Sequence, residues 1–200
     1  MPPVMKVAVG LAVVFGALRL NGFDLLVDPV GWGLCSAGLA GLRRSADDAF
    51  GRARSCAVTL VCASLAVLLT TGTDSEHDLL LSAVGHVARP VSAAGGLLAV
   101  WLIADAVIRR IRPRGDVFGA VLLDVLRWAV VGLGAIGMLA GYGYAEESVV
   151  TVVGWFAALV ALIVVLFRLA GRPFLLSPQE PLPSRAEPAG PAGAPSSEAP

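Results

Sequence analysis

Six apolar runs, each about 12–24 residues long, constrain the fold of this chain more than any other feature of its sequence. A helix needs about 20 largely apolar residues to cross a bilayer, so spans of this length occupy most of a 200-residue chain. The composition agrees, because 15% of the residues are charged, whereas soluble domains carry about 25%. The sequence therefore excludes a soluble globular enzyme, a nucleic-acid-binding protein and a disulfide-stapled secreted module.

These runs predict an all-α fold, a polytopic transmembrane helix bundle over residues 1–172. A backbone in hydrocarbon must satisfy its own hydrogen bonds, so only helices and closed barrels cross membranes. The runs lack the alternating polarity of barrel strands. The predicted spans cover residues 4–20, 25–42, 55–71, 91–108, 117–140 and 148–167. Pro, Ala, Ser, Glu and Gly dominate residues 173–200, which predicts a disordered cytoplasmic tail.

The connections between the spans alternate in charge along the chain. Lys6 lies in the first turn of the first span and precedes its apolar run. The basic connections carry Arg43, Arg44, Arg52 and Arg54, then Arg109, Arg110, Arg112 and Arg114, and finally Arg168 and Arg172. The acidic connections carry Asp24, with Asp28 in the first turn of the second span, then Asp74, Glu76 and Asp78, and then Glu146 and Glu147. Short loops rich in Lys and Arg stay in the cytoplasm, so the pattern predicts six spans with both termini cytoplasmic. The Ala-, Val-, Gly- and Arg-rich composition is typical of a high-G+C bacterial genome, which implies a multi-pass protein of the bacterial cytoplasmic membrane.

The first two spans are the shortest of the six. Residues 7–18 resemble the apolar region of a signal peptide, but a single Lys precedes them and no clean Ala-x-Ala site follows before Arg19. From Pro29 to Leu42 a helix rises only about 21 Å, short of a bilayer core of about 30 Å. We therefore expect this pair to tilt, to thin the bilayer locally, or to form a re-entrant hairpin packed on the other helices.

Residues 79–90 predict a separate amphipathic helix in the outer interface. Two faces alternate at helical spacing, an apolar one and a polar one. The apolar face carries Leu80, Val84, Val87 and Val91, and the polar face carries Ser82, His86 and Arg89. We expect this helix to be broken from the following span near Pro90. The alternative interpretation is a lid over an outward-facing cavity.

Three charged residues stand out inside the spans and form the candidate functional site: Asp105, Asp124 and Arg127. A charge inside the bilayer costs about 3 kcal/mol on insertion scales, so intramembrane charges are the first candidates for function. Asp124 and Arg127 are three residues apart and share a helix face. The preceding span runs antiparallel, so Asp105 is expected to meet this pair. The two interpretations are a proton- or ion-linked polar site and a neutral salt-bridge cluster that fixes helix register.

Glycines recur inside two spans and predict close helix packing. They are Gly31, Gly33, Gly38 and Gly41 in the second span and Gly132, Gly134, Gly137 and Gly141 in the fifth. Packing within the chain is one use for them, and a seam for a homo-oligomer or a membrane-protein partner is the other. Aromatic residues near the outer ends of the spans predict an interfacial belt: Trp32, Trp155, Tyr142 and Tyr144.

No pattern in the sequence identifies a catalytic, metal or cofactor site, so we expect none. The nucleophile-elbow, HExxH and Walker motifs are absent. Cys35, Cys56 and Cys62 fall inside apolar runs without metal or redox spacing, which is typical of structural cysteines. His77 lies in an acidic run that is a loose candidate for a divalent cation, and a solvated loop is the preferred interpretation.

The sequence DLLVDPVGW at residues 24–32, followed by Gly38-Leu39, Phe50 and Ala53, resembles a pattern in uncharacterised small bacterial integral membrane proteins. In that family Pro-Asp precedes a Gly-aromatic pair; here Val27 replaces the proline and Pro29 follows the aspartate. The resemblance implies a membrane protein and no site residues. We expect a non-catalytic protein, structural or accessory to a partner, and the alternative is a small transporter or channel subunit built on the three charged residues.

Overall fold

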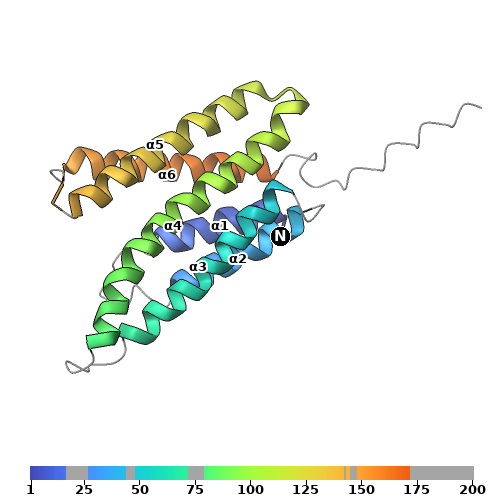
Figure 1. The fold of residues 1–200 in the computed structure, drawn as a ribbon. Coiled ribbons are helices and arrows are strands. Elements are labelled where there is room, and N and C mark those ends of the chain that lie inside the picture. The colour runs from blue at the N-terminus through green and yellow to red at the C-terminus, as the bar shows by residue number, and fades with distance from the viewer. Residues whose placement is uncertain (17–26, 44–47, 72–78, 142, 145–147, 172–200) are drawn as a thin grey trace, which may run out of the picture.

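The computed structural model describes residues 1–16, 27–43, 48–71, 79–141, 143–144 and 148–171, and this part of the chain is all-helical. The predicted tail at 173–200 therefore lies outside the described residues, as do His77 and Tyr142. The helices are α1 (Pro3–Gly16), α2 (Val27–Leu42), α3 (Ala49–Thr71), α4 (Leu79–Ile111), η1 (Arg112–Arg114), α5 (Val117–Gly141) and α6 (Val149–Ala170) (Figure 1).

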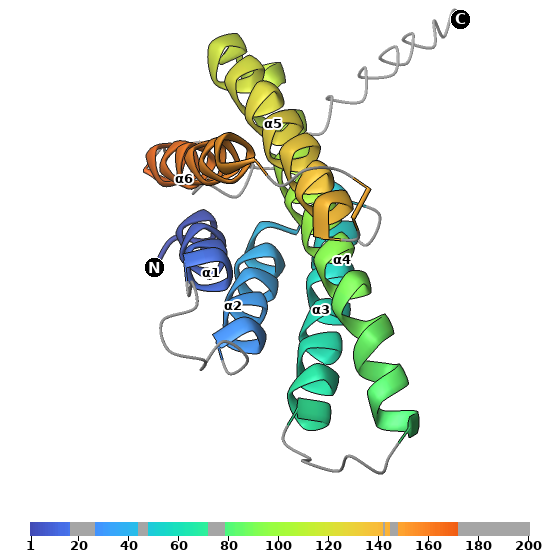
Figure 2. The same cartoon turned by 90° about the vertical axis from the view of Figure 1, so that its left-hand side faces the viewer.

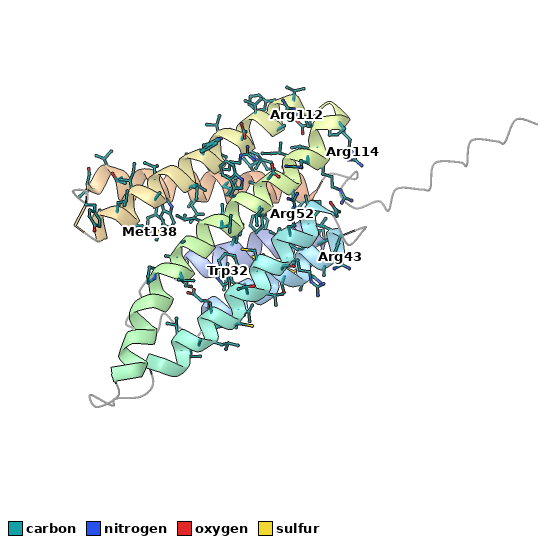
Figure 3. The ribbon with its side chains drawn as sticks, in the orientation of Figure 1. Trp32, Arg43, Arg52, Arg112, Arg114 and Met138 are labelled. Carbon is teal, nitrogen blue, oxygen red and sulfur yellow. The ribbon has the colours of Figure 1, made fainter. Side chains whose placement is uncertain are left out.

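The six α-helices form a closed ring. Each helix packs against the next one in the chain, and α6 also packs against α1 (Figure 2). Successive helices run in opposite directions, so the start of α1, the end of α2, the start of α3, η1 and the end of α6 lie toward the same end of the bundle. Figure 3 shows Arg43, Arg52, Arg112 and Arg114 at this end, which we call the basic end, and Met138 at the opposite end.

Among the described residues, four helices are long and apolar enough to cross a membrane: Ala49–Leu68 in α3, Pro90–Arg114 in α4 and η1, Val117–Gly141 in α5 and Val149–Ala170 in α6. This finding supports the predicted class, a helical membrane protein. The described parts of α1 and α2 have 14 and 16 residues, fewer than a span requires. Exposed apolar side chains cover the outside of the ring, and they include Val125 on α5 and Val153 on α6.

The predicted helix break near Pro90 is wrong, because α4 runs without interruption from Leu79 to Ile111. Proline removes one backbone hydrogen bond and bends a helix without always ending it. Figure 1 shows the first turns of α4 inclined to the rest of the helix. With 33 residues, α4 is about 50 Å long, which exceeds the thickness of a bilayer core.

The α1–α2 contact is so close that only glycine fits at its centre. A Cβ atom at Gly10 would lie 2.6 Å from the carbonyl oxygen of Gly31, and one at Gly38 would lie 2.6 Å from the carbonyl oxygen of Pro3. Cys35 Sγ also donates a weak hydrogen bond to the Val7 carbonyl oxygen at 3.5 Å. The small residues of the second predicted span therefore bring α1 and α2 into backbone contact.

The prediction that Trp32 belongs to an interfacial belt is wrong. Trp32 is 3% exposed and meets the Phe15 ring edge-to-face, with 6.1 Å between the ring centroids. Trp155 packs on the other side of Phe15 at 5.8 Å. These rings join α1, α2 and α6 inside the bundle. Tyr144 is 81% exposed, as the belt interpretation requires.

Candidate functional site

A short connection at the basic end aligns α4 with α5. The 3₁₀ turn η1 follows α4 directly, and Gly115 then adopts a left-handed conformation with φ of 83°. Side chains other than glycine adopt this conformation at a cost, so glycine suits the tight reversal. Asp116 Oδ1 accepts a hydrogen bond from the Gly119 backbone N–H at 3.0 Å and caps the start of α5. The two helices therefore return antiparallel, with their polar residues side by side.

The structure brings the three predicted site residues together. Arg127 Nη1 on α5 donates a hydrogen bond to Asp105 Oδ1 on α4 at 3.1 Å. Arg127 Nη2 lies 2.6 Å from Asp124 Oδ1, one turn earlier on the same helix. Arg109 Nε donates to the second oxygen of Asp105, Oδ2, at 2.7 Å. Two carboxylates and two guanidinium groups thus form one network that is formally neutral.

An aromatic pair covers the network, and this pair was not predicted. The Arg127 guanidinium carbon lies 4.2 Å from the centre of the Trp101 ring. Trp101 in turn meets Trp128 edge-to-face, with 4.5 Å between the ring centroids. A guanidinium over an indole face is stabilised by the negative charge density of the ring. The sequence held a signal for this contact, because Trp101 precedes Asp105 by four residues on one helix face.

The exposed fraction of the four charged side chains increases from the centre of the network to its edges. Arg127 is 15% exposed and Asp105 is 22% exposed, whereas Asp124 reaches 47% and Arg109 reaches 62%. The guanidinium group stays charged in proteins, so the central Arg127 does not relay protons. The arrangement therefore holds two helices together, with Asp124 as the carboxylate most open to the outside of the bundle.

A second arginine fastens the basic end and was not singled out from the sequence. Arg110 Nη1 donates a hydrogen bond to the Leu42 carbonyl oxygen at 2.9 Å, 68 residues away in the chain. Its guanidinium carbon lies 5.5 Å from the centre of the buried Phe50 ring. Arg110 thus ties the end of α4 to the end of α2 and to the start of α3. A cation at a helix C-terminus also balances the partial negative charge of that terminus.

The glycines of α5 divide into two groups. A Cβ atom at Gly134 would lie 2.6 Å from a methyl carbon of Leu97 on α4, so this position supports packing within the chain. Gly132, Gly137 and Gly141 have nothing within 4 Å of an added Cβ atom. Gly33 on α2 is equally open. The predicted Gly-x-x-x-Gly pair at 137 and 141 therefore makes no close helix contact in the described part of the chain.

The remaining chemical groups take ordinary structural positions. The three cysteines are free thiols, with Cys35 buried and Cys62 exposed. Ser36 Oγ donates to the carbonyl oxygen of Gly33, one turn earlier in its helix. Among the described residues, no group of three or more His, Cys, Asp or Glu side chains is arranged to hold a metal ion. Comparison with known proteins finds no matching family model, no matching curated protein and no matching solved structure.

Proposed function

We propose that this chain is a non-catalytic integral membrane protein that serves a structural role or an accessory role to a partner. One observation carries the proposal: Arg127 pairs with both Asp105 and Asp124, and Arg109 pairs with Asp105. The intramembrane charges of this network thus neutralise each other in ion pairs. A compensated network costs far less in a bilayer than separate charges do, and it fixes the register of α4 against α5.

In this proposal the chain crosses the bacterial cytoplasmic membrane six times, with α1 and α2 as a short, closely packed pair. The basic end faces the cytoplasm, because short loops rich in Arg stay on that side. Figure 3 supports this orientation, since four of the labelled arginines share one end of the bundle. The exposed apolar side chains of α5 and α6 then contact lipid or a membrane-embedded partner.

The second candidate is a small transporter or channel subunit. The 47% exposed side chain of Asp124 favours it, because ionisable residues inside membranes mark ion pathways and this carboxylate is only partly covered by the protein. In such a protein Asp105 and Asp124 exchange partners during transport. The accessory role requires instead that both carboxylates keep their arginine partners.

Ion flux through proteoliposomes distinguishes the two roles. The full chain is reconstituted into vesicles with a pH-sensitive dye, and a proton or potassium gradient is imposed. The accessory role predicts a flux equal to that of protein-free vesicles, and Asp124→Asn and Asp105→Asn leave it unchanged. Flux above the protein-free level that both substitutions abolish would overturn the proposal in favour of transport. Arg168→Gln is the control, since Arg168 is an exposed residue outside the network.

A further inference from the structure

The charged network between α4 and α5 opens onto the outer surface of the bundle. Arg109 is 62% exposed and Asp124 is 47% exposed, although each of them holds an ion pair inside the network. Trp128, one turn beyond Asp124 on the same face of α5, is 59% exposed. The buried residues Leu123 and Val130 lie on the opposite face of this helix. We call Arg109, Asp124 and Trp128 the polar seam.

Lipid is a poor neighbour for this seam. Asp124 lies about 10 Å from the start of α5 at Val117, which places its carboxylate inside the proposed span. A long arginine side chain can reach back to the aqueous interface, but the single methylene group of an aspartate cannot. Charges inside membranes almost always face protein or water. The exposed carboxylate therefore favours a second protein surface over the seam.

The exposed base and the exposed acid of the seam lie at nearly the same depth. Arg127 on α5 donates a hydrogen bond to Asp105 on α4, so these two residues mark one level of the bundle. Arg109 lies four residues nearer to the basic end on α4, which is about 6 Å along the helix. Asp124 lies three residues nearer on α5, which is about 4.5 Å. A two-fold axis along the bundle keeps every residue at its own depth, so it can place Arg109 of one copy beside Asp124 of the other.

The rest of the seam leaves room for such a neighbour. Arg109 donates from Nε to Asp105, and the other N–H groups of its guanidinium can serve a second carboxylate. Farther from the basic end, α4 presents Leu98, which is 53% exposed, and α5 presents the exposed Ala135. Ala135 follows Trp128 by seven residues and shares its helix face. A small residue at this position lets Leu98 of a second copy approach closely.

We propose that a second copy of this chain docks on the polar seam and forms a parallel two-fold dimer, in which Arg109 of each copy pairs with Asp124 of the other. Charge complementarity selects this occupant, because one copy supplies both members of the ion pair at one depth. The inference rests on the membrane placement of α4 and α5 in the proposed function. It names the partner that a structural or accessory role requires.

Energy transfer between copies in lipid vesicles tests the dimer. The full chain is labelled with donor or acceptor at Ser75→Cys, in a background without the three native cysteines, and both preparations are reconstituted together at increasing dilution in lipid. Transfer above the level of random encounters is expected. Arg109→Gln should weaken association about tenfold, since each dimer loses two ion pairs while Asp105 keeps Arg127. Arg168→Gln, at an exposed arginine of α6, is the matched control and leaves association unchanged.

Cross-linking locates the interface and does not depend on the Arg109 variant. Two differently tagged copies without native cysteines are co-expressed, one with Leu98→Cys and the other with Ala135→Cys. Oxidation of the membranes should join the two tags through a disulfide. Leu98→Cys with Val153→Cys, at an exposed valine of α6, is the control pair and should stay unlinked.

Each result decides a separate part of the proposal. Transfer at the random level in the wild-type chain would overturn the dimer and leave the seam to lipid or to a different membrane protein. Association of Arg109→Gln equal to wild type would overturn the ion pair between copies, and equal cross-linking of both cysteine pairs would overturn the location. Ion flux is measured on the same vesicles, so a dimer that conducts ions would overturn the accessory role and leave this inference standing.

Discussion

Arg127 uses its guanidinium group in three directions, toward Asp105, toward Asp124 and over the Trp101 ring. The two ion pairs follow from sequence spacing, because residues three apart share a helix face and consecutive spans are antiparallel. The ring contact follows from spacing only in part, because Trp101 shares a helix face with Asp105 but its contact with Arg127 depends on how α4 is rotated about its axis against α5. Sequence reasoning thus located the charged residues of the network and missed their aromatic cover.

Removal of Arg127 alone is expected to destabilise the protein. Arg127→Leu leaves Asp124 without its cationic partner and should cost about 3 kcal/mol, whereas Asp105 keeps Arg109. The double variant Asp124→Leu with Arg127→Leu should recover much of this loss, since apolar side chains then pack in place of the ion pair. Thermal unfolding of the detergent-solubilised variants measures both, with Arg112→Leu as the control. An Arg127→Leu variant as stable as wild type would show that the network does not hold α4 to α5.

At the scale of helices, the glycines of α1 and α2 set how closely two elements approach. Composition predicted close packing for the second and fifth predicted spans alike. The structure separates them, because Gly31 and Gly38 contact α1 whereas Gly137 and Gly141 are open. Sequence position was equally insufficient for Trp32. Because this residue lies near the end of a predicted span, it was predicted to lie at the membrane interface. Tertiary packing decides which face of a helix meets a neighbour, and a single sequence does not reveal this face.

Adding a methyl group at Gly38 is expected to separate α1 from α2. The new Cβ atom would lie 2.6 Å from the Pro3 carbonyl oxygen, and backbone does not yield as a flexible side chain does. Gly38→Ala should therefore cost about 1–3 kcal/mol in the free energy of unfolding. Gly137→Ala is the matched control and should stabilise the protein by up to about 1 kcal/mol, since alanine is the better helix former. Thermal unfolding in detergent compares the two, and equal midpoints would contradict the close contact.

At the scale of the whole molecule, the sequence predicted the helical class and the alternating direction of the helices. Charge in the connections carried this information, because the labelled arginines Arg43, Arg52, Arg112 and Arg114 share one end of the bundle in Figure 3. Closure of the ring through α6 and α1 was not predictable, since hydropathy gives no order of helices around an axis. The continuity of α4 through Pro90 was also missed. In a helix bundle, neighbouring helices help to satisfy the backbone groups that a proline frees, so the helix continues where an isolated one would end.

Cysteine labelling tests the proposed orientation. In a background without the three native cysteines, Ser45→Cys and Ser75→Cys are introduced one at a time. An impermeant thiol reagent added to intact cells should label position 75 and spare position 45, because the arginine-rich connection stays inside. Lysed cells provide the control in which both positions react. Labelling of position 45 alone in intact cells would reverse the topology.

Closure of the ring has a consequence for the order of assembly. A ribosome delivers α1 first and α6 last, and the two helices pack against each other. Until α6 is made, the face of α1 that α6 covers stays open. Until then, α1 packs on α2 through the close glycine contact. The ring closes only when α6 packs against α1.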